Sequence, residues 1–237
     1  MKQFVWTVLL AGSLALPALS QVTSQDNPEY EKQYGEPLKH HDWRVAVGGG
    51  YAYRLGKVQK TGDAKLDDLS KQLRNAFNLD ADAQYFFKQG WGLGLNANYC
   101  SGKVSGDDIT VEFQDGDRNI TNYKETQNML FVGPAFVART ESSKFLLVSS
   151  LALGPLFYMD EMDLDGRIVN ANATTVGFNA GLAGEYKLSA KAGVGLKLSY
   201  TVGSVNSVKV EGQTAKFDEP MNVSNLMLTA FLSFRTW

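Results

Sequence analysis

The stretch that decides the fold is Trp43–Leu55, WRVAVGGGYAYRL, whose side chains alternate strictly between two faces. One face carries Trp43, Val45, Val47, Gly49, Tyr51, Tyr53 and Leu55, and the other carries Arg44, Ala46, Gly48, Gly50, Ala52 and Arg54. A period of two over this length predicts a strand that is longer than most strands of soluble proteins. Aromatic residues near both ends of the apolar face are typical of strands that cross a membrane.

The same alternation recurs along the chain, with apolar residues on one face and small, polar or charged residues on the other. It is clear at Asn78–Phe87, Trp91–Cys100, Val176–Leu188 and Gly193–Val202. Further strands are expected at Thr126–Arg139, Lys144–Tyr158 and Val223–Arg235. In the first two of these, apolar residues occupy both faces, so the sequence does not assign an inner side. The pattern predicts eight strands in total.

The connections between these strands alternate between short and long. The short ones are Lys88–Gly90, Thr140–Ser143 and Ser189–Lys191, and the long ones are Gly56–Ala76, Gly102–Tyr123, Asp160–Ala173 and Ser204–Asn222. This sorting is typical of an up-and-down membrane barrel, which has short turns at one end and long loops at the other. Glycines are frequent on the polar faces, which suits the narrow interior of an eight-stranded barrel. We therefore predict an all-β fold, an eight-stranded antiparallel up-and-down transmembrane β-barrel, over residues 42–237.

The N-terminal residues indicate export. Lys2, the apolar run Phe4–Leu16 and the small residues of Ala18-Leu19-Ser20 predict a signal peptide over residues 1–20, cleaved near Ser20–Gln21. Residues 21–41 are polar and aperiodic, and we expect a mobile periplasmic segment. With 23 basic and 25 acidic residues the chain carries a net charge of −2, which argues against nucleic-acid binding.

With these features the chain resembles the small bacterial outer-membrane β-barrels of the OmpX or OmpA-barrel type. The resemblance covers Trp43–Trp237 and includes the hairpin start Gly90–Leu95, the Gly133-Pro134 pair and a final strand with a terminal aromatic residue. It implies a location in the outer membrane of a Gram-negative cell, in contact with lipid and lipopolysaccharide. It also implies assembly by periplasmic chaperones and the barrel-insertion machinery, with Phe234 and Trp237 as the C-terminal insertion signal.

The polar faces define a candidate site inside the barrel. Six charged residues are expected to face the lumen: Arg44, Arg54, Asp80, Asp82, Glu185 and Lys197. Because buried charges must be paired, we expect a mixed-sign network that plugs the lumen, with Glu185 and Lys197 paired across adjacent strands. The alternative is a polar path for small solutes.

The sequence offers little for catalysis or for a cofactor. Its two histidines, His40 and His41, both precede the first strand, so no barrel histidine can act as a base, and we expect no enzymatic activity. The acidic run Asp160–Asp165 predicts a solvated loop; a calcium loop is the alternative, but Asn172 stands where the bidentate glutamate belongs. We expect no metal and no cofactor.

One long connection contains a helical pattern. Leu66, Leu69, Leu73 and Phe77 recur at helical spacing after Asp63, a plausible N-cap. The segment is either a short helix on the barrel rim or the beginning of the second strand.

The sequence thus predicts a non-enzymatic outer-membrane barrel with a polar, plugged lumen. It would serve envelope integrity or surface interaction through four extracellular loops. Two alternatives remain open, a narrow diffusion channel and a soluble exported lipocalin-like binder of apolar ligands.

Overall fold

The computed structural model describes residues 43–56, 63–88, 90–113 and 116–236. The predicted signal peptide, the segment 21–41 and Trp237 lie outside the described residues. Among those described, no helix is long and apolar enough to cross a bilayer.

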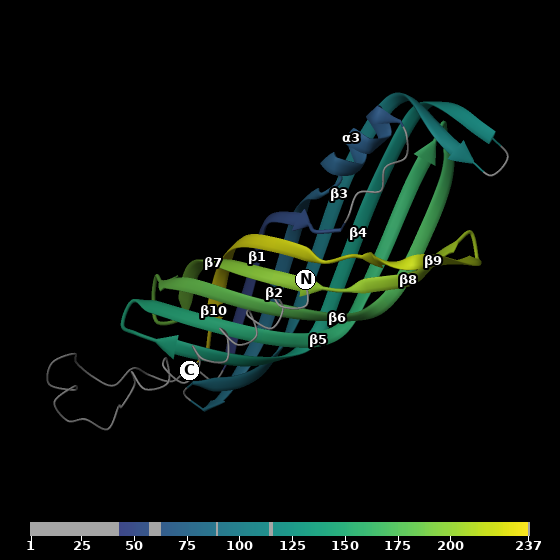
Figure 1. Cartoon of the computed structure of the whole chain (residues 1–237). Helices are drawn as coiled ribbons and strands as arrows, with labels where there is room; N and C mark the ends of the chain where they lie inside the picture. The colour runs from purple at the N-terminus through teal and green to yellow at the C-terminus, as the bar shows by residue number, and fades with distance from the viewer. Residues whose placement is uncertain (1–42, 57–62, 89, 114–115, 237) are drawn as a thin grey trace, which may run out of the picture.

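The described chain forms one antiparallel sheet that closes on itself (Figure 1). Its elements are β1 (Trp43–Arg54), α3 (Ala64–Gln72), β2 (Asn75–Lys88), β3 (Trp91–Phe113), β4 (Gly116–Glu141), β5 (Phe145–Leu164), β6 (Arg167–Lys187), β7 (Ala192–Val202), β8 (Ser204–Val210), β9 (Gln213–Asn222) and β10 (Asn225–Arg235). The closed ring runs β1–β2–β3–β4–β5–β6–β7–β10, and β10 pairs back onto β1 from Arg44↔Arg235 to Arg54↔Asn225. The predicted eight-stranded up-and-down barrel is confirmed.

The outer face of the ring is apolar and the inner face is largely polar. Val47, Leu95 and Leu196 are 57%, 58% and 59% exposed, whereas Glu185 and Lys197 are each 2% exposed. A lipocalin-like barrel would place its apolar face inside and its polar face in water. The soluble binder is therefore wrong, and the arrangement is that of a membrane barrel.

The wall formed by β4 and β5 differs from the rest of the lumen. Phe131 and Val137 of β4 and Leu146 and Leu156 of β5 point inward and are buried. Lipid contact makes the outer face of these strands apolar as well, and this is why their two faces looked alike in the sequence.

Three of the predicted long loops are strands instead. The segment Gly102–Tyr123 lies mostly in the β3–β4 hairpin, Asp160–Ala173 lies in the β5–β6 hairpin, and Ser204–Asn222 forms β8 and β9. Two-residue turns at Asp165-Gly166 and Glu211-Gly212 have positive φ at both positions, the geometry that matches the twist of a hairpin. The barrel wall therefore continues beyond the apolar band.

The remaining long connection contains the helix. The Asp63 side chain accepts hydrogen bonds from the backbone N–H groups of Lys65 (2.7 Å) and Leu66 (3.2 Å), as an N-cap does. Leu66 and Leu69 are buried together with residues of the β3–β4 hairpin, among them Ile109 and Ile120. The helical pattern is confirmed over Ala64–Gln72, and the chain then enters β2 at Asn75 (Figure 1).

Candidate functional site

The candidate site is a set of buried charges that five strands of the ring project into the lumen. We call it the lumen charge network: Arg44 from β1, Asp80 and Asp82 from β2, Glu185 from β6, Lys197 from β7 and Arg235 from β10. All six are at most 5% exposed. Each side chain occupies the inward position of an alternating strand, so the strand period fixes its direction.

Glu185 joins two arginines that come from the strands closing the barrel. Its Oε2 accepts hydrogen bonds from Arg44 at 2.8 Å (Nη2) and 3.0 Å (Nε). Its Oε1 forms an ion pair with Arg235, whose Nη2 lies 3.0 Å away. Arg44 also donates to Gln84 Oε1 at 2.9 Å and lies over the Phe231 ring. These contacts tie β6 to β1 and β10 across the lumen.

Lys197 holds the other half of the network. Its ammonium lies 2.7 Å from both Asp80 Oδ1 and Asp82 Oδ2. Asn96 donates to Asp82 at 2.8 Å, and Asn98 donates to Asp80. Asparagines of β3 therefore supply the additional hydrogen bonds that a buried ion pair needs.

The network is balanced in charge and has room for its side chains. With all six groups ionised, three positive charges face three negative ones. Glycines supply the room: a Cβ at Gly193 would lie 2.2 Å from Glu185 Oε1, and one at Gly181 would lie 3.1 Å from Lys197 Cε. Larger residues at these positions would displace the charged groups.

The pairing within the network differs from the sequence prediction in two respects. Glu185 and Lys197 do not pair, because Glu185 lies opposite Gly195 in the β6–β7 ladder and each side chain finds its partners across the lumen. Arg54, the sixth predicted residue, is not in the network at all. It contacts Gln127 and lies over the Tyr158 ring at 5.5 Å.

Arg54 belongs to a second polar group, the mouth cluster, which consists of Arg54, Tyr123, Glu125, Gln127, Tyr158 and Asp160. Tyr123 donates to Glu125 at 2.5 Å and Tyr158 donates to Asp160 at 2.8 Å. The Gln127 amide bridges the two carboxylates, at 2.7 Å from Glu125 and 3.2 Å from Asp160.

Apolar side chains separate the two polar groups. On β1, Ala52 lies between the lumen charge network and Arg54. On β4, Phe131 and Met129 lie between the network and Gln127. They form one buried cluster with Leu156, Val205, Val223 and Met227, among others. Buried amides share this stretch, among them Asn225, which donates to Val223 O at 3.1 Å, and Asn78, which donates to Thr229 at 2.7 Å.

The acidic segment Asp160–Asp165 forms part of the β5–β6 hairpin. Asp165 accepts from the backbone N–H groups of Asn122 (2.7 Å) and Thr121 (3.1 Å), and Asp163 accepts from that of Gly166 (2.8 Å). The prediction of a solvated loop is wrong for Asp160, which lies in β5 within the mouth cluster. Within the described ranges, no three His, Cys, Asp or Glu side chains gather so that they could hold a metal ion.

Comparison with known proteins agrees with this architecture. No protein-family model and no curated protein matches the sequence. Among solved structures, a major outer membrane protein of Thermus thermophilus matches with a TM-score of 0.50 at 10% identity, over 82% of this chain and 100% of that one. The chain has the fold of the small outer-membrane β-barrels.

Two further barrels are similar at lower scores. Neisserial surface protein A matches at 12% identity and TM-score 0.48, over 81% of this chain and 96% of that one. The outer membrane protease OmpT of Escherichia coli matches at 8% identity and TM-score 0.48, over 84% and 98%. These two likenesses carry no argument about the chain, and the match to the Thermus thermophilus protein, at 10% identity, shows the fold alone.

One member of the lumen charge network, Arg235, and three hydrogen-bond partners of its members, Gln84, Asn96 and Asn98, were absent from the sequence prediction. Gln84, Asn96 and Asn98 lie on faces already recognised as polar, and Arg235 has inward parity because Phe234 beside it points outward. Strand parity could therefore have found all four. It could not have shown which of them meet.

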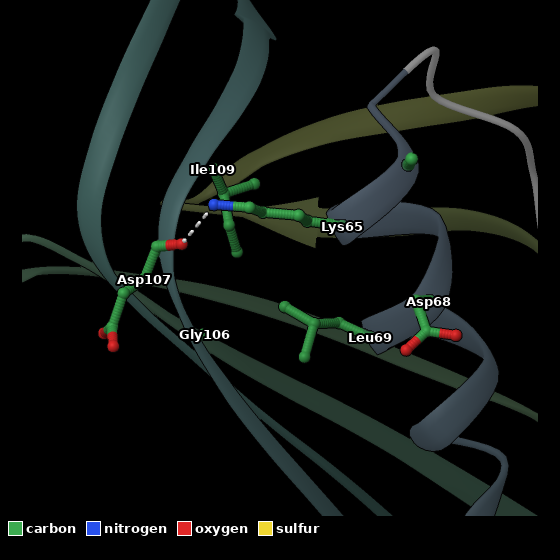
Figure 2. A pocket seen from close by; sticks show the side chains of 7 residues that line it. Lys65, Asp68, Leu69, Gly106, Asp107 and Ile109 are labelled. Atoms are coloured by element: carbon green, nitrogen blue, oxygen red, sulfur yellow. Dashed lines mark hydrogen bonds between the residues drawn. The ribbon is translucent and has the colours of Figure 1, made fainter.

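The barrel also has an outer groove between α3 and β3, shown in Figure 2. It measures about 380 Å³, with Leu69 and Ile109 as its apolar lining and Asp68 at its edge. The Lys65 ammonium crosses it to the backbone oxygens of Asp107 (3.4 Å) and Asp108 (3.2 Å). The groove lies at the end of the barrel that carries the long hairpins (Figure 1).

Proposed function

We propose that the protein is a non-enzymatic outer-membrane barrel whose lumen is closed by the lumen charge network. It serves envelope integrity or surface interaction through the helix and hairpins at its long-loop end. The observation that carries this proposal is the pairing of six buried charges across strands β1, β2, β6, β7 and β10.

Burial and pairing together support a plug. An eight-stranded barrel has an interior just wide enough for its own side chains. A water-filled path would leave the charges hydrated, whereas here Arg44 and Lys197 are 1% and 2% exposed. The buried apolar cluster around Phe131 and Leu156 fills further space next to the network.

The residue chemistry supports a role other than catalysis. Both histidines precede β1, so the barrel wall has no imidazole to activate a nucleophile. The carboxylates of the mouth cluster accept hydrogen bonds from tyrosine and glutamine side chains and form part of the filling of the lumen.

The proposal includes membrane partners and an assembly route. The apolar outer face would contact outer-membrane lipid and lipopolysaccharide, and periplasmic chaperones and the insertion machinery would deliver the chain. Phe234 is 61% exposed on β10, where it could be read as an insertion signal together with Trp237. A Phe234→Ala variant should then accumulate unassembled, without the heat-dependent gel shift of a folded barrel.

Conductance across a planar bilayer tests the plug. We expect no steady current from the wild-type protein, and we expect Lys197→Ala to admit ions because Asp80 and Asp82 lose their common cation. Lys209→Ala, at an exposed position on β8, is the matched control and should stay closed. A steady wild-type current equal to that of Lys197→Ala would make the protein a diffusion channel.

A further inference from the structure

The barrel wall has a fork between β6 and the β7–β8 segment. Pairing of β6 with β7 ends at Phe178↔Val202, and β6 meets β8 again only at Asn172↔Lys209. Between these pairs, no ladder joins residues 173–177 to residues 203–208, all of which are described. The far end of β8 thus returns to β6, at Ala171↔Val210, and the gap in the ladder is closed at both ends (Figure 1).

A groove of about 430 Å³ occupies the fork. Leu153, Val176 and Val202 line its outer side and are 58%, 70% and 39% exposed. Ser204 and Asn222 line it at the base of the β8–β9 hairpin. Its volume lies within the range of about 300–1,000 Å³ that is usual for small-molecule sites.

Two glycines form the floor of this groove. A Cβ at Gly203 would lie 2.4 Å from Leu156 Cδ2, and a Cβ at Gly177 would lie 3.1 Å from Leu156 Cβ. Leu156 belongs to the buried apolar cluster of the lumen. The Cβ positions of both glycines would therefore point towards the lumen and away from the groove, and the floor presents backbone atoms beside the apolar side chains of the outer side.

The surroundings determine the chemistry of the occupant. The groove is continuous with the apolar outer face, so its neighbours in a membrane are acyl chains. The unpaired edge of β6 leaves backbone N–H and C=O groups without ladder partners, which is costly in hydrocarbon. A molecule with a hydrocarbon chain suits the apolar surroundings, and its ester or hydroxyl oxygens can form hydrogen bonds with the backbone groups that have no ladder partner.

We propose that the fork is a binding site for one acyl chain of a membrane amphiphile. The chain lies along Leu153, Val176 and Val202, and the polar head lies towards Ser204 and Asn222. The site concerns the outside of the wall, so it does not depend on whether the lumen conducts.

Native mass spectrometry of the delipidated full-length barrel, titrated with a single-chain palmitoyl lysophospholipid, tests this site. We expect one saturable adduct for the wild type. Val176→Trp and Val202→Trp fill the groove and should weaken the adduct at least tenfold. Leu198→Trp is the matched control, because Leu198 is 51% exposed on the same strand but lies within the intact ladders opposite Leu182 and Leu228. Its adduct should be unchanged.

The heat-dependent gel shift verifies that each variant is folded, and bulky residues on the outer face leave the lumen untouched. Adducts that do not saturate, or that persist equally in Val176→Trp and Val202→Trp, would mean general lipid contact and would overturn the site. Equal weakening in Leu198→Trp would do the same.

Discussion

Glu185 holds two arginines at once, as Lys197 holds two carboxylates. Glu185→Ala would leave Arg44 and Arg235 without their common carboxylate in a space where they are 1% and 3% exposed. Breaking a buried pair in this way costs about 3–5 kcal/mol. We expect a loss of that size in the free energy of unfolding, measured by urea titration in lipid vesicles.

Glu211→Ala provides the control for this measurement. Glu211 faces Arg167 at 3.7 Å with both side chains more than half exposed, so its loss should cost about 0–1 kcal/mol. In double-mutant cycles, Glu185 should couple strongly to Arg44 and only weakly to Lys197. A stronger coupling of Glu185 to Lys197 than to Arg44 would mean that Glu185 pairs with the adjacent strand β7 instead.

Asp160 gives the barrel a pH dependence at its mouth. It lies beyond Phe157, the last large apolar residue that the described part of β5 exposes outward. Burial, reinforced by the Glu125 carboxylate, raises the pKa of Asp160 to about 7 from an ordinary value near 4. The folded state thus penalises the charged form, and the penalty is absent below about pH 4 and complete above about pH 7.

We therefore expect the wild type to lose stability between pH 5 and pH 8 relative to Asp160→Asn, by more than about 1 kcal/mol. Arg54, Tyr158 and Gln127 face the same carboxylate and limit the effect. Parallel stability curves for the two proteins over this range would contradict a folded-state pKa of Asp160 near 7.

The sequence determines which side of the wall a residue occupies better than it determines the residue's partner. Alternation alone placed Arg44, Asp80, Asp82, Glu185 and Lys197 inside. It failed for the Glu185–Lys197 pair because inward side chains of a closed barrel also contact residues on strands across the lumen. Arg44 reaches Glu185 from a strand that is not a ladder neighbour of β6, and only closure of the ring brings them together.

At the scale of a strand, the outward face of β7 should tolerate charge only where it leaves the lipid. Leu196→Arg puts a charge on a residue that is 59% exposed in the apolar band, and we expect a cost of about 2–4 kcal/mol in vesicle folding experiments. Asn206→Arg, on the exposed side of β8, should cost about 0–1 kcal/mol. Similar values for both would mean that the face around Leu196 does not lie in lipid.

The elements that the sequence predicted well are those with one clear environment on each face. β1, β2, β3, β6, β7 and β10 alternate because lipid lies on one side and a polar lumen on the other. β4 and β5 face apolar neighbours on both sides, so their periodicity is lost. Outside the membrane the hairpins are polar on most of their surface, and no alternation revealed that the predicted loops continue as strands.

For the whole molecule, the topology predicts which segments lie outside the cell. α3 and the tips of the long hairpins lie at the opposite end from the short turns (Figure 1). Epitope tags inserted at Asp117, Asp165 and Gly212 should be accessible to antibodies on intact cells, and a tag at Ser142 should be accessible only after lysis. Labelling of the Ser142 tag on intact cells would mean that the barrel has the opposite orientation in the membrane.

The pairing of β1 with β10 also governs how the chain can reach this state. It joins the first and last described strands, so the ring stays open until nearly all of the chain is in place. Such long-range closure slows folding, because the entropy of a very large loop is lost before its contacts form. Until then β1 and β7 each present an unpaired edge that can template aggregation. A chain truncated before β10 would therefore give insoluble aggregates instead of a seven-stranded barrel.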